Sequence, residues 1–153
     1  MEQSMDFFAI APEGLKAMLG LETYCRRAGL EHSLLELVKT RVSQINGCAY
    51  CIDMHTKDAR AGGETEQRLY ALAAWRETAF FSERERAALA WAEALTEIAG
   101  KGVAEGLRTE TLRFFSEKEL VDLTLAIVAI NGWNRLAIPF RTPPGSYKTG
   151  SVR

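Results

Sequence analysis

The stretch that most constrains the fold is residues 120–130, which read LVDLTLAIVAI and are apolar nearly all round a helix. A capping box formed by Ser116 and Glu119 precedes it, and Pro139 follows it, so we expect a helix that ends near Leu136. The run is shorter than the roughly 18 apolar residues that a membrane span needs. We therefore expect a helix surrounded by protein, either in a domain centre or at a subunit interface.

The remaining chain repeats its apolar residues mostly with the period of a helix. Pro12, the pair Gly62-Gly63 and a second capping box at Ser82 are boundary signals. No strand pattern and no internal repeat stands out. The sequence predicts an all-α fold, with further helices over residues 12–28, 31–45, 46–61, 65–77, 82–99 and 109–115.

The helix expected over residues 31–45 has two faces. Its leucine, valine and isoleucine side chains fall on one side at 100° per residue. The polar side chains on the other side are expected to face solvent: Glu36, Lys39, Thr40 and Ser43.

Composition narrows the class of protein. With 153 residues, 47% of them apolar, the chain fits one domain or one helical unit that assembles with copies of itself. A net charge of −1 argues against a nucleic-acid or anionic-membrane partner. The N-terminus has no basic region leading into an apolar run, so we expect a cytoplasmic protein. Three cysteines in such a protein are more often catalytic or metal-binding than structural.

The densest chemistry lies in residues 46–55, NGCAYCIDMH, a C-x-x-C-x-x-x-H motif. Asn46-Gly47 interrupts the preceding pattern and predicts a new helix start, with Cys48 and Cys51 in its first turn. His55 follows Cys51 by four residues, and we expect all three side chains on the inward face. A helix start and an imidazole both favour the reactive thiolate. The motif therefore indicates a redox pair that forms a disulfide and is reduced by an external dithiol.

Other interpretations of the motif stay open. The two cysteines and His55 could bind zinc with Cys25 or His32 as the fourth ligand. The cysteines could also simply pack in the core, and His55 could be a core histidine beside a redox pair. Cys25 stands alone and is expected to be a small buried hydrophobe.

The spacing from Glu36 through the cysteine pair to His55 resembles the AhpD-like alkylhydroperoxidase group of the carboxymuconolactone decarboxylase superfamily. The flanking segments RVSQING (41–47) and NGWNR (131–135) are also similar to that group, and the resemblance covers about residues 12–140. It implies an all-helical AhpD-like domain over residues 1–140 that works as a homo-oligomer, a trimer or a hexamer. Residues 141–153, which contain Pro-Pro-Gly, are then a C-terminal extension, flexible or draped over a partner.

The same resemblance implies the roles of the site residues. Cys51 would attack a hydroperoxide, His55 would be its proton partner, Cys48 would be the resolving thiol, and Glu36 would be an acid/base group near Cys48. The implied activity is that of a peroxidase or disulfide reductase in antioxidant defence. It needs no bound cofactor or metal, only an external dithiol such as a thioredoxin-type or lipoyl-type reductant.

Tyr50 departs from the pattern of the group. It stands where the best-studied members have a second histidine, and a phenol with a pKa near 10 relays protons poorly near neutral pH. Slow turnover is therefore expected. The alternatives to an enzyme are a redox-sensing oligomeric module and a zinc-stabilised structural protein.

Overall fold

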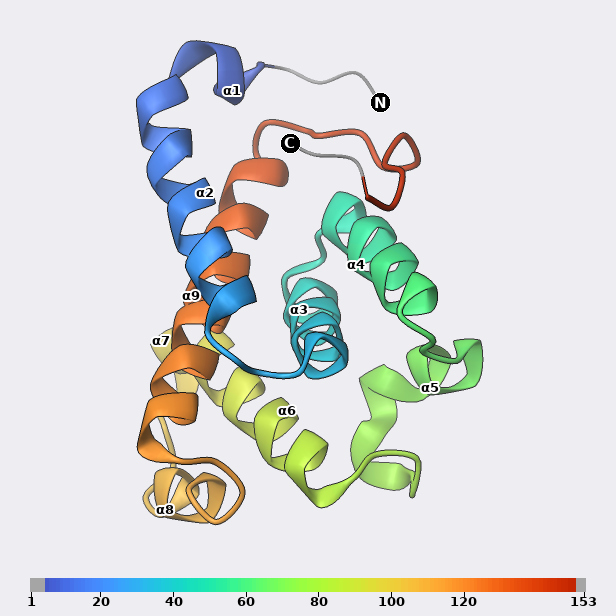
Figure 1. Cartoon of the computed structure of the whole chain (residues 1–153), viewed down its shortest axis with the longest axis vertical. Helices are drawn as coiled ribbons and strands as arrows, with labels where there is room; N and C mark the ends of the chain where they lie inside the picture. Colours follow the sequence, from blue (N-terminus) through green and yellow to red (C-terminus); the bar gives the residue numbers. More distant parts are fainter. Residues whose placement is uncertain (1–4, 151–153) are drawn as a thin grey trace.

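The computed structural model describes residues 5–150, and every regular element in that part is a helix, as predicted (Figure 1). The helices are α1 (Phe7–Ile10), α2 (Pro12–Arg27), α3 (His32–Asn46), α4 (Ala49–Ala61), α5 (Glu66–Ala71), η1 (Leu72–Glu77), α6 (Glu83–Thr96), α7 (Ile98–Lys101), α8 (Leu107–Thr111) and α9 (Glu117–Ala137).

The predicted apolar helix is α9, the longest element (Figure 1). Both halves of its capping box form, since the Ser116 hydroxyl accepts from the Glu119 amide and the Glu119 carboxylate accepts from the Ser116 amide. α9 packs against α2, α3, α6 and α4. Val121 and Val128 on α9 nevertheless remain 57% and 54% exposed. The single chain thus encloses α9 only in part, and the oligomer stays a prediction.

The prediction of a solvent-facing polar side on α3 is wrong. Glu36, Lys39, Thr40 and Ser43 are all buried. The reason is that α3 lies in the middle of the fold, where α4, α6 and α9 pack against it from different directions (Figure 1). A helix covered on several sides buries its polar residues as well, and these then need partners within the protein.

The prediction that Asn46-Gly47 starts a helix is also wrong in detail. Asn46 is the last residue of α3, and Gly47 follows it in the left-handed conformation with φ of 71°. Glycine adopts this backbone easily and commonly ends a helix. Cys48 is then the N-cap of α4, which does place the cysteine pair at a helix start.

The Asn46 side chain has a different role. Its amide donates hydrogen bonds to the side-chain oxygens of Asn131 (3.0 Å) and Asn134 (2.8 Å) on α9. Asn134 in turn donates to the Ser43 hydroxyl at 3.2 Å. This partly buried polar group fixes the turn between α3 and α4 against α9, so it positions the cysteines that follow.

Three other expected helices differ from the observed ones. Residues 65–77 form α5 and then the 3-10 helix η1, and Ala74 within η1 leaves helical geometry (φ −116°, ψ 31°). Residues 82–99 also form two helices, with the break at Glu97, although the capping box at Ser82 is confirmed. The helix expected over residues 109–115 begins and ends earlier, as α8.

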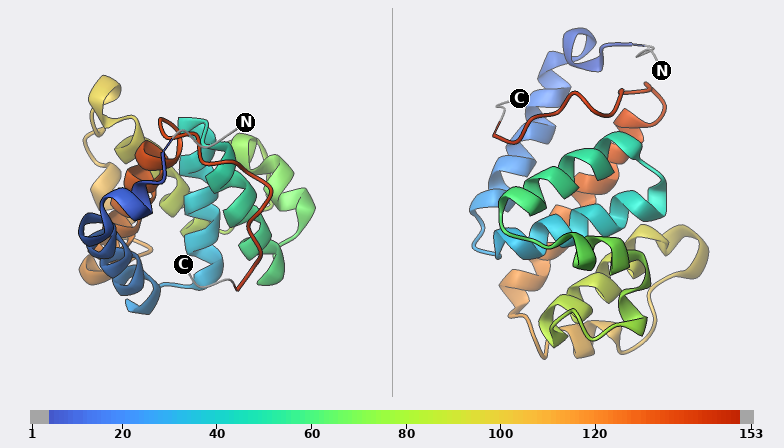
Figure 2. Two further views of the ribbon diagram at one scale, coloured as in Figure 1. Left: turned by 90° about the horizontal axis from the view of Figure 1, so that it is seen from above. Right: turned by 90° about the vertical axis from the view of Figure 1, so that its right-hand side faces the viewer.

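The described part of the C-terminal extension lies along α4 of its own chain (Figure 2). The Gly145 amide donates to Asp53 at 3.0 Å, and Lys57 donates to the carbonyl of Tyr147 at 3.1 Å. The Tyr147 hydroxyl lies 2.8 and 2.9 Å from the two carboxylate oxygens of Asp58. Within residues 5–150 no helix has both the length and the apolar character required to cross a membrane.

Candidate active site

Cys48 and Cys51 form a disulfide at the N-terminus of α4, with their Cα atoms 5.3 Å apart. The Cys48 sulfur also caps the helix, because it accepts a hydrogen bond from the Cys51 amide at 3.4 Å. The two residues are only 1% and 2% exposed, as expected for an inward face. In this state neither sulfur is a free thiolate, so the pair is not available to bind zinc.

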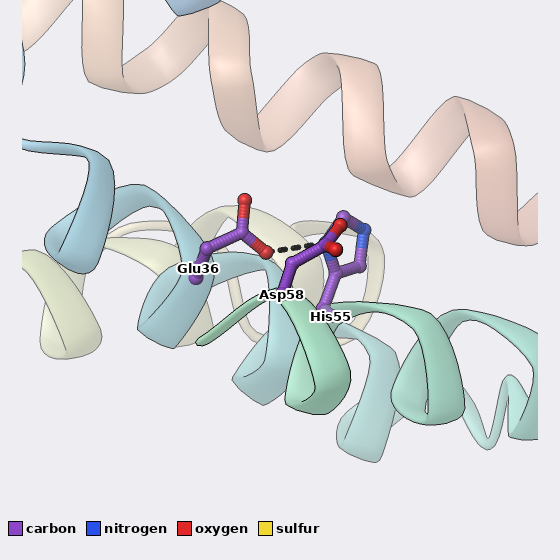
Figure 3. A group of neighbouring side chains, drawn as sticks. All are labelled: Glu36, His55 and Asp58. Atoms are coloured by element: carbon purple, nitrogen blue, oxygen red, sulfur yellow. Dashed lines mark hydrogen bonds and ion pairs between the residues drawn. The ribbon is translucent and has the colours of Figure 1, made fainter. Parts of the chain in front are cut away.

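His55 lies one turn after Cys51 on the same buried face of α4 and contacts Glu36 on α3. Its Nδ1 is 2.8 Å from Glu36 Oε2, and both residues are 5% exposed (Figure 3). The exposed His32 approaches the other carboxylate oxygen, with 3.7 Å between its Nε2 and Glu36 Oε1. The structure thus joins Glu36 to His55 as a buried acid–base pair, which the helical pattern of α3 alone did not indicate.

Two carboxyl groups have lowered pKa values here: that of Glu36 in the pair and that of the neighbouring Glu22. Burial by itself raises the pKa of Glu36, but the hydrogen bond and charge of His55, with smaller effects of Lys39 and His32, more than offset it. For Glu22, burial is likewise outweighed by its ion pair with Lys39. Both groups are therefore carboxylates at neutral pH.

A cleft of about 550 Å³ opens beside the acid–base pair. Its walls come from α2, α3, α4, α9 and the C-terminal extension, and they include Glu36, His55, Trp133 and Tyr147. The disulfide does not line this cleft. A second hollow of about 380 Å³ is lined by Phe7, Phe8 and Tyr50 together with residues of the extension. Tyr50 thus lies in a different hollow from His55 and Glu36.

Asp58 is a member of the site that the sequence reasoning missed. One donor atom from each of Glu36, His55 and Asp58 can be chosen so that all three lie within 4.8 Å of one another (Figure 3). The spacing of three residues between His55 and Asp58 was the available signal, because such residues are neighbours on a helix.

Cys25, by contrast, takes no part in the site. It is buried and not disulfide-bonded, which confirms the expected small hydrophobe. Burial raises the pKa of its thiol, so this cysteine is kept in the unreactive protonated form.

The chain is similar to several known proteins. The model of the family described as "Carboxymuconolactone decarboxylase family" matches residues 12–94. The uncharacterised protein YdfG of Bacillus subtilis (strain 168) is 48% identical over 138 residues, which cover 90% of this chain and 94% of that one. YnjA of Escherichia coli (strain K12), also uncharacterised, is 31% identical over 67% of this chain and 56% of its own length.

Solved structures share the fold. The Agrobacterium tumefaciens protein ATU0492, of unknown function and described as a candidate antioxidant defence protein AhpD, superposes with a TM-score of 0.91 at 40% identity, over 95% of this chain and all of that chain. A peroxidase-related protein from Silicibacter has a TM-score of 0.81 at 23% identity, over 95% of this chain and 78% of that one. The second match concerns the fold alone.

Proposed function

The chain belongs to the carboxymuconolactone decarboxylase family, and we propose that it is a dithiol-dependent hydroperoxide reductase that acts in antioxidant defence. One observation carries the proposal: a disulfide at a helix start lies one turn before a buried histidine that is hydrogen-bonded to a carboxylate. The similarity to the Agrobacterium tumefaciens protein described as a candidate antioxidant defence protein AhpD supports the role in antioxidant defence.

The proposed reaction starts from the reduced pair. The Cys51 thiolate attacks one peroxide oxygen, the O–O bond breaks, and the alkoxide leaves after it takes a proton from protonated His55. Glu36, which lies 2.8 Å from Nδ1, stabilises the imidazolium before transfer and keeps the ring oriented. Cys51 is then a sulfenic acid and the peroxide has become an alcohol.

Cys48 completes the cycle as the resolving thiol. Its sulfur attacks the sulfenic sulfur of Cys51, water leaves, and the disulfide forms. An external dithiol, of the thioredoxin or lipoyl type, then supplies two electrons and two protons through a mixed disulfide. Because both cysteines are buried, this last step requires an opening of the chain around α4 or a small reductant.

We also propose a homo-oligomer, because α9 leaves exposed valines on one side.

The test is steady consumption of t-butyl hydroperoxide with a dithiol. Cys51→Ser should abolish this consumption. The Cys48→Ser variant should stop after one turnover and leave a sulfenic acid on Cys51 that dimedone traps. Cys25→Ser is the matched control and should keep the wild-type rate. If Cys51→Ser keeps its rate, the proposal is wrong. A disulfide that forms once and is not turned over would instead support a redox sensor, and helicity lost to a chelator would support a zinc-stabilised structural protein.

A further inference from the structure

The two histidines of the chain approach the same carboxylate. His55 Nδ1 lies 2.8 Å from one oxygen of Glu36, and His32 Nε2 lies 3.7 Å from the other. Asp58 brings a second carboxylate to the same place (Figure 3). We propose that Glu36, His55 and Asp58 form a binding site for a divalent transition-metal ion of the zinc class, and that the bound ion inhibits the redox site.

The donor set suits such an ion. One imidazole nitrogen with two carboxylate oxygens is a ligand set that zinc accepts, with water in the fourth position. Tetrahedral zinc with bonds of 2.0–2.2 Å holds its ligand atoms about 3.4 Å apart. The three donor atoms already lie within 4.8 Å of one another, so rotations of side chains are sufficient to close the site.

The backbone also favours this arrangement. His55 and Asp58 are three residues apart on α4, and Glu36 is on α3, which packs directly against α4. Two helices therefore supply the ligands, and a site on helices is more rigid than a site on loops. Tyr147 donates its hydroxyl to Asp58 and would orient that carboxylate as an outer partner of the metal.

Space and charge are compatible with a cation. The three residues line the cleft of about 550 Å³, which offers a path for an ion from solvent. The neighbouring Lys39 is already paired with Glu22. Glu36 and Asp58 bring two negative charges to this cleft, which Arg26 also lines, and a divalent ion would neutralise them.

Occupancy of the site has a defined effect on the proposed chemistry. A His55 nitrogen that binds the ion cannot carry a proton, because a metal ligand must be deprotonated, so a metal-bound His55 is not an imidazolium. His55 then cannot deliver a proton to the leaving alkoxide. This inhibition rests on the proposed function, whereas binding of the metal does not.

The binding test uses the oxidised, metal-free full chain titrated with Zn²⁺ in a calorimeter, and Co²⁺ absorbance as a report on coordination. We expect one ion per chain. Asp58→Asn should weaken binding at least tenfold. Asp53→Asn, on the same helix and also bonded to the C-terminal extension, is the matched control and should bind as the wild type does. A Cys48→Ser, Cys51→Ser double variant should still bind, which excludes thiol ligands.

The functional test separates the two proposals. Zn²⁺ should inhibit hydroperoxide turnover by the wild type, and Asp58→Asn should need at least tenfold more Zn²⁺ to lose half of its own metal-free rate. Binding without any hydroperoxide turnover would refute the proposed function and leave the metal site intact. No binding to the oxidised wild type, or equal binding by Asp58→Asn and Asp53→Asn, would overturn the metal site.

Discussion

Replacement of Glu36 by glutamine tests the acid–base pair directly. The substitution keeps the size of the side chain and its ability to accept from His55 Nδ1, but removes the negative charge. Both side chains are 5% exposed and their polar atoms are 2.8 Å apart, so the interaction takes place largely away from water. A hydrogen bond to a charged group contributes about 1.5–3 kcal/mol, compared with about 1 kcal/mol for a neutral one.

These values give the size of the effect. If the carboxylate stabilises the imidazolium that delivers the proton, the difference of about 0.5–2 kcal/mol between the charged and the neutral hydrogen bond lowers kcat/KM by about 2- to 30-fold, since about 1.4 kcal/mol is tenfold. The free energy of unfolding should fall by no more than this difference, because the hydrogen bond survives in neutral form.

The assay is hydroperoxide turnover across pH, with urea unfolding of the same preparation. Glu13→Gln, an exposed carboxylate in the first turn of α2, is the control for loss of one charge and should leave kcat/KM unchanged. If Glu36→Gln keeps kcat/KM within twofold while its stability falls, Glu36 only holds the structure together and the proton role is refuted.

Three further predictions concern stability. Folding lowers the pKa of Glu22 and Glu36, so the stabilisation that they give is present above the unfolded carboxyl pKa of about 4.3 and is lost as pH falls through the folded values. The urea midpoint should therefore drop with acid, and it should drop less in the Glu22→Gln, Glu36→Gln double variant. An equal dependence of the urea midpoint on pH in the two proteins would contradict this. Gly47→Ala places a Cβ at φ 71° and should cost about 1–2 kcal/mol by thermal unfolding; an unchanged Tm would show that the turn relaxes freely. Leu37→Ala, at a fully buried position, should cost about 2–5 kcal/mol by urea unfolding, and a value under about 1 kcal/mol would mean that the core collapses around the gap.

Local signals predicted several helix boundaries well. Pro12 and the capping serines Ser82 and Ser116 mark helix starts that the structure confirms, because each acts on the few backbone groups beside it. The spacing of Cys48, Cys51 and His55 likewise predicted a shared buried face, since one helix carries all three. In these cases interactions between residues close in the sequence were sufficient to predict the structure.

Burial that depends on distant segments was not predictable in the same way. A helical wheel of α3 places Glu36 on the polar side, and only the packing of α4 reveals that this side is covered. The local pattern predicts a helix start at Asn46, whereas in the structure the Asn46 amide donates to Asn131 and Asn134, more than 80 residues later. The resemblance to a known family predicts a role for Glu36 in the site, which the wheel does not, and that role stays a prediction.

The Cys48 cap has a consequence for the redox equilibrium of the pair. In the disulfide its sulfur is a weak acceptor for the Cys51 amide, but a Cys48 thiolate would be a strong one at the positive end of α4. A charge at a helix terminus gains about 0.3–1 kcal/mol, which corresponds to a rise of about 6–20 mV in the reduction potential of a two-electron couple. The start of α4 thus biases the pair toward accepting electrons, and the helix itself favours the return from disulfide to dithiol.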